Sequence, residues 1–295
     1  MSFVYIKLPK TGLGNMLLVW ARGLVFATEH EVECITSSWW GFRWGALLRG
    51  EKRKRVYWRY FEETPVIRQF LAAYLLKKYD VIEEPSIGKS GNLKDEGKTV
   101  YVFNKIITEP DVFESLNDRR EYIKLELINN LHHSKKKLLE KYKNPVIGIH
   151  IRRGDFKLGS TITPIEYFVE GIKRIREYAN EELSVTIFTD ALPEEIAPVL
   201  ALPNVVIAEN KPDIIDILLL SRSKIMILSS TSTFGYWAAF LSDAIVLRHK
   251  SDWLNTIRTA KEGSLYTEIK WDINDTNANT LLKGKVAILK QSIKL

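Results

Sequence analysis

Short runs of β-branched and aromatic residues recur along the chain, with helix-compatible stretches between them. The runs cover residues 3–8, 99–103, 145–151, 184–190, 204–209 and 224–230. Strands that alternate with helices favour parallel sheets of βαβ units over an all-β or all-α fold. In the second half the runs are continuous in Val, Ile and Leu, which is typical of a parallel sheet covered on both faces. The pattern predicts an α/β protein.

Local signals place helices between these strands. Thr163 offers an N-cap hydroxyl, Pro164 stands at the first helical position, and Glu166 follows in the first turn. Apolar residues then recur at helical spacing, at Ile165, Phe168, Ile172 and Ile175. These features predict a helix over 164–179. After the first strand, the same spacing is seen at Leu13, Leu17, Trp20, Leu24 and Ala27.

The chain is long enough for two domains. It has 295 residues, and a typical domain has roughly 150. The polar stretch 130–144, which ends before Pro145, is the best candidate for a boundary. We therefore expect one domain over 1–143 and a second over 144–295.

Composition indicates a folded protein of a reducing compartment. Apolar residues make up 45% of the chain and charged residues 27%, with a mean hydropathy of -0.12, far from the signature of disorder. Cys34 is the single cysteine, so neither an internal disulfide nor a cysteine-based zinc site can form. The sequence begins with no signal-peptide pattern and contains no apolar run long enough to span a membrane. We expect a cytoplasmic protein.

The positive charge is concentrated in the first half of the chain. Of the net charge of +7, residues 1–144 hold 25 Lys and Arg against 18 Asp and Glu, and residues 145–295 hold 18 of each. The densest basic segment, 41–61, also carries several Trp and Tyr residues. Cations with interleaved aromatics suit an anionic membrane surface, and a solvated turn with its rings in the core is an equal alternative. No nucleic-acid motif accompanies this charge, so we expect no nucleic-acid partner.

The stretch 147–156 indicates an anion site. A buried strand leads into His150, Arg152, Arg153, Gly154 and Asp155. Two guanidinium groups therefore stand at the carboxyl end of a strand, where open α/β sheets bind ligands, and the planar arginine fork matches phosphate. The alternative is an Arg–Asp salt bridge that closes the turn, with His150 as an ordinary core histidine.

Two further stretches carry chemistry. Hydroxyls at Ser230, Ser232 and Thr233 precede an apolar helix, which is a natural phosphate site, although simple N-capping also explains them. A turn with Gly12, Gly14 and Asn15 follows the first strand. It is a weak nucleotide signal, because the third glycine of the dinucleotide pattern is missing, and a packing turn is the alternative. No Asp-x-Asp, P-loop, HExxH or GxSxG motif occurs, so the sequence predicts no metal site.

Taken in order, these stretches resemble glycosyltransferase family 11, the α-1,2-fucosyltransferases. The matching motifs are GLGN at 12–15, HIRRGDF at 150–156, FTD at 188–190 and TSTFGYWAA at 231–239. The resemblance implies a GT-B-like fold of two Rossmann-type domains whose parallel sheets face a central cleft. The second domain would hold a GDP-fucose donor and the first an acceptor, either an oligosaccharide or a lipid-linked glycan. Transfer would be inverting, need no divalent metal, and go to the 2-hydroxyl of a galactose.

The resemblance also implies roles for particular residues. Arg152 would contact the donor pyrophosphate, and His150 and Asn15 would lie at the reacting centre, with Gly12 and Gly14 on the acceptor side. The donor would further contact Arg153, Gly154, Asp155, Asp190, Ser230, Ser232, Thr233 and Phe234.

The chain departs from the family pattern at Met16, at Ala191 and at the pair Gly235-Tyr236, which replaces Ser-Trp. These departures affect acceptor identity more than donor chemistry. Two alternatives therefore stay open: a GT-B transferase that uses another nucleotide sugar, and a non-catalytic glycan- or nucleotide-binding protein of the same fold.

Overall fold

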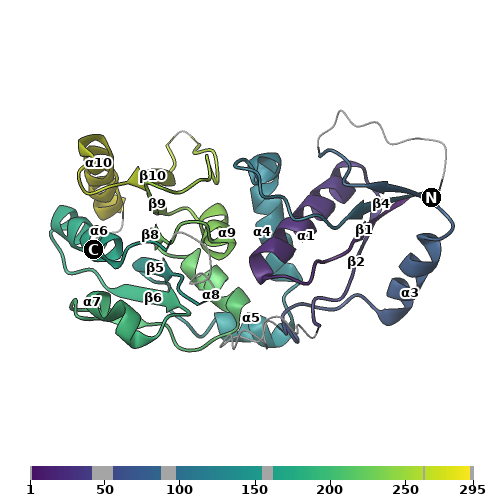
Figure 1. The fold of residues 1–295 in the computed structure, drawn as a ribbon, viewed down its shortest axis with the longest axis horizontal. Helices are drawn as coiled ribbons and strands as arrows, with labels where there is room; N and C mark the ends of the chain where they lie inside the picture. The colour runs from purple at the N-terminus through teal and green to yellow at the C-terminus, as the bar shows by residue number, and fades with distance from the viewer. Residues whose placement is uncertain (1, 42–55, 88–97, 155–161, 262, 293–295) are drawn as a thin grey trace. The chain divides into compact units, whose positions relative to one another are not determined.

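The computed structural model describes residues 2–41, 56–87, 98–154, 162–261 and 263–292 (Figure 1). Contacts divide the chain into two compact units, one made of residues up to Lys137 and the other starting at Leu138. The sequence places this boundary a few residues later, between 143 and 144. The segment between the two positions lies at the end of a short helix, α5 (His133–Leu139), and in the turn after it.

Unit 1 is built on a parallel sheet with strand order β2-β1-β4-β3. Its strands are β1 (Phe3–Ile6), β2 (Glu33–Thr36), β3 (Asp80–Glu83) and β4 (Thr99–Phe103). Its helices are α1 (Leu13–Glu29), α3 (Val66–Leu75), the 3-10 helix η1 (Glu114–Arg119), α4 (Arg120–Asn129) and α5. The connection from β1 to β2 through α1 is a βαβ unit, although β2 is not among the strand runs predicted from the sequence.

Close packing of α1 against the sheet explains one of its glycines. A Cβ atom on Gly23 would lie 2.5 Å from Cγ1 of Ile6 and 3.3 Å from the ring of Phe103. The helix therefore rests directly on β1 and β4, and a larger side chain at Gly23 would push it off the sheet.

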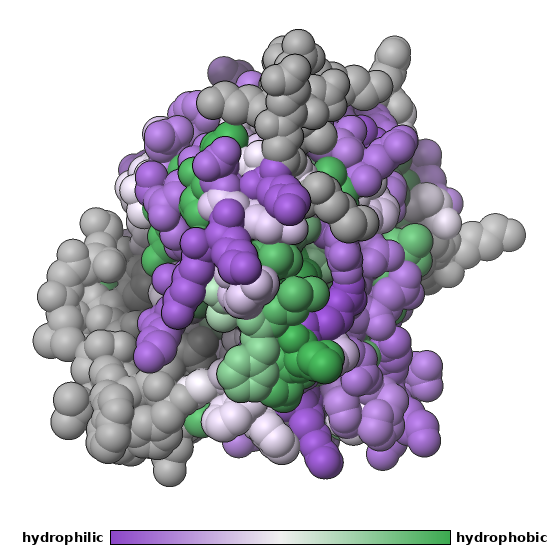
Figure 2. All heavy atoms as spheres, turned by 90° about the vertical axis from the view of Figure 1, so that its right-hand side faces the viewer, coloured by the Kyte–Doolittle hydropathy of each residue, from purple (hydrophilic) through white to green (hydrophobic). Residues whose placement is uncertain are grey.

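The outer face of α3 is apolar and exposed. The inner face packs Ala72, which is fully buried, against Phe3, Ile35 and Val100 of the sheet. The outer face forms an apolar patch (Figure 2), made of Val66, Ile67, Phe70, Leu71 and Tyr74, each between 48% and 78% exposed. Single exposed apolar residues are ordinary, but five on one short helix form an unusual surface.

Unit 2 contains a larger parallel sheet with strand order β10-β9-β8-β5-β6-β7. The strands are β5 (Ile147–Ile151), β6 (Val185–Thr189), β7 (Val205–Ile207), β8 (Ile225–Leu228), β9 (Ile245–His249) and β10 (Thr267–Trp271). The helices are α6 (Ile165–Ala179), the 3-10 helix η3 (Pro193–Ile196), α7 (Ala197–Leu200), α8 (Asp213–Leu220), α9 (Thr233–Leu241) and α10 (Thr276–Ser292).

This strand order has a functional consequence. From β5 the chain adds β6 and β7 on one side and then returns to add β8, β9 and β10 on the other. The order therefore reverses between β5 and β8, and the helices that follow these two strands diverge. A doubly wound sheet binds its ligand at the carboxyl ends of the strands at this switch point.

The predicted α/β class is confirmed, and each of the six predicted strand runs contains a strand. The helix predicted over 164–179 is α6, which begins at Ile165. One detail was wrong: Pro164 is the cap residue, and Thr163 makes no cap because its hydroxyl is used elsewhere. None of the helices among the described residues is long and apolar enough to span a membrane.

Candidate functional site

The residues that follow β5, β6 and β8 meet at the switch point of unit 2. Arg152 follows β5, Asp190 follows β6 and Ser229 follows β8. The Arg152 backbone N–H donates to Ser229 Oγ at 2.9 Å, and the Ser229 N–H donates to the His150 carbonyl at 3.0 Å. These bonds join the ends of β5 and β8, so the two motifs that the sequence predicts to carry anion chemistry lie side by side.

Asp190 fixes the arginine turn. Its Oδ2 lies 2.5 Å from Nη1 of Arg152, and its Oδ1 accepts the backbone N–H of Arg153 at 2.8 Å. A Cβ atom on Gly154 would lie 2.5 Å from Oδ2 of Asp190, so the close approach requires glycine there. The Arg–Asp salt bridge that the sequence offers as an alternative to an anion site is therefore present. Its acidic partner is Asp190. Asp155 lies outside the described residues.

The two arginines differ in exposure. The Arg152 side chain is 25% exposed and pairs with Asp190. Arg153 is buried, and burial lowers the pKa of its guanidinium, against the opposing effect of Glu195 and Asp190. Arg152 is thus placed to meet a ligand, and direct contact by Arg153 stays a prediction.

The serine-rich turn before α9 leaves polar groups available for an anion. Ser232 occupies the cap position, yet no side chain caps the helix. Ser230 is 3% exposed, and its Oγ has no hydrogen-bond partner among the described residues. Simple N-capping therefore does not explain these hydroxyls. The N-terminal N–H groups of α9, which begins at Thr233, favour a negatively charged ligand beside them.

A buried network holds this turn in an uncommon conformation. Thr231 has a φ of 59°, which is rare for a β-branched residue. Its N–H donates to the Tyr236 hydroxyl at 2.7 Å, and that hydroxyl donates to Oδ1 of Asp252 at 2.5 Å. The neighbouring Ser230 N–H donates to Oγ1 of Thr163 at 2.9 Å. Three side chains therefore shape the backbone of the turn.

Charged groups lie behind the network. Nε of Arg248 lies 3.9 Å from Asp252 and 3.5 Å from Glu268, and both arginine and aspartate are buried. Burial, followed by the charge of Asp252, raises the pKa of Tyr236 far above its usual range. Tyr236 therefore keeps its proton and donates to the carboxylate.

His150 and Phe234 connect the two motifs by stacking. Their rings are 4.8 Å apart and inclined by 16°, and His150 is 4% exposed. A Cβ atom on Gly235 would lie 3.2 Å from Nδ1 of His150. The replacement of the family's serine by Gly235 therefore gives the imidazole room at the start of α9.

The glycine turn of unit 1 lies at the start of α1. Gly12 is the cap residue, with a φ of −64°, and Gly14 is buried in the first turn. Neither glycine adopts a left-handed conformation. Nδ2 of Asn15 donates to Oγ1 of Thr11 at 3.3 Å, which orients the half-buried amide. This geometry agrees with the alternative that the glycine turn serves packing. Contact of the turn with an acceptor stays a prediction.

The sequence did not predict the roles of several residues of the unit 2 site. Thr163, Tyr236 and Asp252 act on the serine turn through hydrogen bonds. A lone hydroxyl before Pro164 signals an N-cap, and Asp252 stands in no motif. Only the departure from the family pattern at Tyr236 marked that position in advance.

The assembled site has the chemistry of an anion receptor. A partly exposed guanidinium, a buried hydroxyl with no partner in the described chain, and a helix N-terminus come together at the switch point of a doubly wound sheet. Each of these groups stabilises a phosphate.

Solved fucosyltransferase structures resemble this chain. NodZ α-1,6-fucosyltransferase co-crystallised with GDP is 14% identical over 85% of this chain and 95% of that chain, with a TM-score of 0.50. A variant of FUT1 from Arabidopsis thaliana in complex with GDP is 14% identical over 84% and 70%, with a TM-score of 0.49. POFUT1 in complex with GDP-fucose is 11% identical over 82% and 94%, with a TM-score of 0.48.

The likeness to NodZ bears out the α/β, GT-B-like fold. No curated protein sequence matches the chain. The sequence profile of Glycosyl transferase family 11 matches residues 52–271, which is most of the length of this chain. This range contains the motifs at 150–156, 188–190 and 231–239 and excludes the turn at 12–15. With the switch-point site and this match together, the chain belongs to glycosyl transferase family 11.

Proposed function

We propose that this protein is a fucosyltransferase that takes its sugar from GDP-fucose. The observation that carries the proposal is the convergence of Arg152, the Ser230 hydroxyl and the start of α9 at one edge of the sheet. The GDP and GDP-fucose bound to NodZ, FUT1 and POFUT1 support the choice of donor.

The proposed reaction is an inverting displacement at the anomeric carbon. An acceptor hydroxyl forms a new C–O bond on one face of the sugar and releases its proton to solvent, while the bond to the diphosphate breaks on the other face. The electron pair leaves with GDP, so negative charge grows on the diphosphate as the sugar becomes oxocarbenium-like. Arg152 and the N–H groups at the start of α9 stabilise that charge, and no divalent metal is required. Removal of one such donor typically slows a reaction by about 10²–10³.

The acceptor is proposed to be a galactose 2-hydroxyl in a glycan or a lipid-linked precursor. The support is the resemblance to α-1,2-fucosyltransferases, together with the polar side chain of Asn15 in the first turn of α1. NodZ is an α-1,6-fucosyltransferase, so linkage varies among proteins of this fold. In this proposal unit 1 binds the acceptor and Asn15 lies at the reacting centre.

A donor panel tests the proposal. Purified protein is incubated with GDP-fucose, GDP-mannose and UDP-galactose, with EDTA present, and release of nucleoside diphosphate is followed with and without galactose-terminated acceptors. We expect release from GDP-fucose alone, stimulated by acceptor. Preferential release from another donor would favour a GT-B transferase with a different sugar. GDP binding without any release would favour a non-catalytic binding protein.

We also infer that the enzyme is cytoplasmic and contacts an anionic membrane through 41–61. Residues 42–55 of this segment lie outside the described residues. Beside them, Trp40 and Trp58 are 48% and 55% exposed and pack edge to face at 5.4 Å, and Arg59 lies over the Trp58 ring. Exposed indoles next to cations suit a lipid interface. Flotation with phosphatidylserine vesicles should recover the protein, and equal recovery with neutral vesicles or none with either would contradict this.

A further inference from the structure

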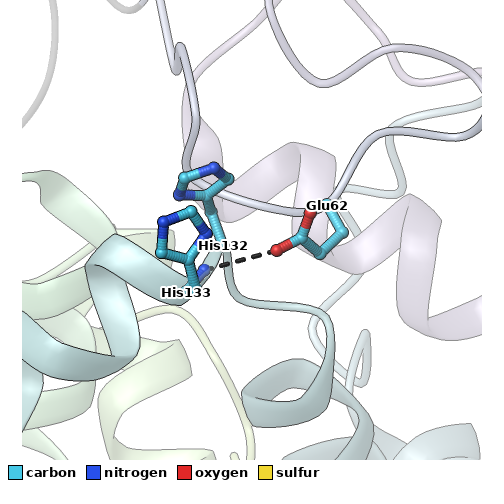
Figure 3. A group of neighbouring side chains, drawn as sticks. All are labelled: Glu62, His132 and His133. Carbon is cyan, nitrogen blue, oxygen red and sulfur yellow. Dashed lines mark hydrogen bonds between the residues drawn. The ribbon is translucent and has the colours of Figure 1, made fainter.

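Unit 1 brings together three side chains that can bind a transition metal, Glu62, His132 and His133 (Figure 3). One ligand atom of each lies within 4.8 Å of the others. Glu62 and His133 are exposed and His132 is half-buried, so an ion can reach them from solvent. Glu62 is distant in sequence from the two histidines, which is why no sequence motif marks the group.

A short antiparallel bridge holds the two segments together. Phe61 pairs with Leu131, and both side chains are buried, with exposures of 1% and 0%. The Glu62 N–H donates to the Asn130 carbonyl at 2.8 Å, and the His132 N–H donates to the Tyr60 carbonyl at 3.1 Å. Because neighbours in extended chain point to opposite faces, burying the bridge pair places Glu62 and His132 on the open face.

Further contacts orient the possible ligands. Nδ1 of His132 accepts the Ser134 backbone N–H at 3.3 Å and lies 2.8 Å from Oγ of Ser134, which leaves Nε2 as the ring nitrogen for a metal. The His133 N–H donates to Oε1 of Glu62 at 3.3 Å, and the two imidazole rings lie 4.1 Å apart. These contacts fix the orientation of the His132 ring, which is what an outer partner does for a metal-binding histidine.

The neighbouring lysines are directed to other groups. Nζ of Lys136 donates to the Asn129 carbonyl at 2.7 Å, and Nζ of Lys135 lies over the Tyr60 ring at 5.8 Å. Two imidazoles and a single carboxylate are a poor set for Mg²⁺ or Ca²⁺, which prefer several oxygens. They are a good set for Zn²⁺, Ni²⁺ or Co²⁺.

We propose that Glu62, His132 and His133 form a binding site for Zn²⁺, with water in the remaining coordination position. The metal joins the segment around Phe61 to the junction between α4 and α5. It therefore stabilises unit 1. The proposal is independent of the function proposed above.

The test measures metal binding directly on protein without an affinity tag. Equilibrium dialysis against Zn²⁺ gives stoichiometry and affinity, and the visible absorption of bound Co²⁺ reports a tetrahedral nitrogen and oxygen site. We expect one Zn²⁺ per chain and a Zn²⁺-dependent rise in melting temperature that EDTA reverses. Mg²⁺ should give neither effect.

Variants locate the site. His132→Ala should abolish stoichiometric binding, and Glu62→Gln, at an exposed position, serves as a second variant if His132→Ala fails to fold. Loss of the outer partner in Ser134→Ala should weaken binding by about 10–100-fold. The matched control is His249→Ala, because Nδ1 of His249 lies 2.7 Å from Oγ of Ser251 in the same local arrangement. Wild-type protein without bound Zn²⁺, or variants at Glu62 and His132 that bind it normally, would overturn the proposal.

Discussion

Asp190 shows how one carboxylate can organise a ligand site. It binds the side chain of Arg152 and the backbone of Arg153 and leaves no room for a side chain at Gly154. A pair between groups that are 25% and 18% exposed contributes little stability by itself, because solvent screens it. Its value is geometric, since it keeps a flexible arginine at the edge of the sheet where a diphosphate would lie.

The roles of some residues could be predicted from the sequence, and the roles of others could not. The motif at 150–156 and Asp190 could be singled out from the sequence because arginine, aspartate and glycine each have a restricted chemistry, and the structure brings them together. Thr163 was misassigned, since a hydroxyl before a helix serves equally as a cap or as an acceptor for a distant N–H. Only the three-dimensional structure shows that the distant donor is Ser230.

Cys34 should be unreactive in the folded protein. Burial raises the pKa of its thiol to about 12, so very little thiolate exists near neutral pH. Compared with an ordinary thiol of pKa about 8.5–9, labelling at mild alkaline pH should be slower by on the order of 10³-fold. An aromatic disulfide reagent, followed by absorbance, should react with one thiol only after denaturant is added. Rapid labelling of native protein would contradict this.

At the scale of elements, the turn between β8 and α9 is held by side chains. Thr231 keeps its positive φ because its N–H reaches the Tyr236 hydroxyl, which in turn bonds Asp252. The backbone conformation of the turn directs the first N–H groups of α9, so we expect the tyrosine to affect ligand binding through the turn and not by contact.

Tyr236→Phe should therefore weaken GDP binding. The change removes two buried hydrogen bonds, worth about 1–3 kcal/mol where a partner is left unsatisfied. Release of the turn should lower GDP affinity by about tenfold, which corresponds to 1.4 kcal/mol. Calorimetry measures the affinity, and thermal melting measures the stability.

Tyr266→Phe is the matched control for this prediction. Tyr266 is also buried and donates to a carboxylate, Oε1 of Glu268, at 2.5 Å, and within the described ranges no hydrogen bond joins its side chain to the turn. It should cost similar stability and leave GDP affinity unchanged. Equal affinity losses in both variants would show that the effect is general destabilisation.

Helices and strands with a clear pattern of apolar residues could be predicted from the sequence. Those with a mixed apolar and polar pattern could not. Strands β5 and β8 lie fully buried, and their continuous apolar runs marked them. Strand β3 is an edge strand with Asp80 and Glu83 at its ends, so its sequence lacks a buried run. Helix α10 buries only a narrow stripe and includes Gly284, which weakens its helical pattern.

The free energy of unfolding of the whole protein should fall at alkaline pH. Burial raises the pKa values of Tyr167, Tyr236 and Tyr266, so these phenols stay protonated in the folded protein. In the unfolded chain they ionise near pH 10. Above that pH the unfolded state binds fewer protons, and the free energy of unfolding falls by up to about 1.4 kcal/mol per pH unit for each tyrosine.

Denaturant unfolding across this pH range checks the prediction. The decline should begin near pH 10, and Tyr266→Phe should make it less steep. A free energy of unfolding that stays constant from about pH 9 to 11 would contradict it.

We propose that the switch-point site of unit 2 binds the diphosphate of GDP. The most direct test is calorimetric titration with GDP, and in parallel with UDP, CDP and ADP, in the presence of EDTA. We expect selective GDP binding that is lost in Arg152→Ala, while circular dichroism shows that this variant keeps its fold. Absence of GDP binding, a preference for UDP, or full affinity in Arg152→Ala would contradict it.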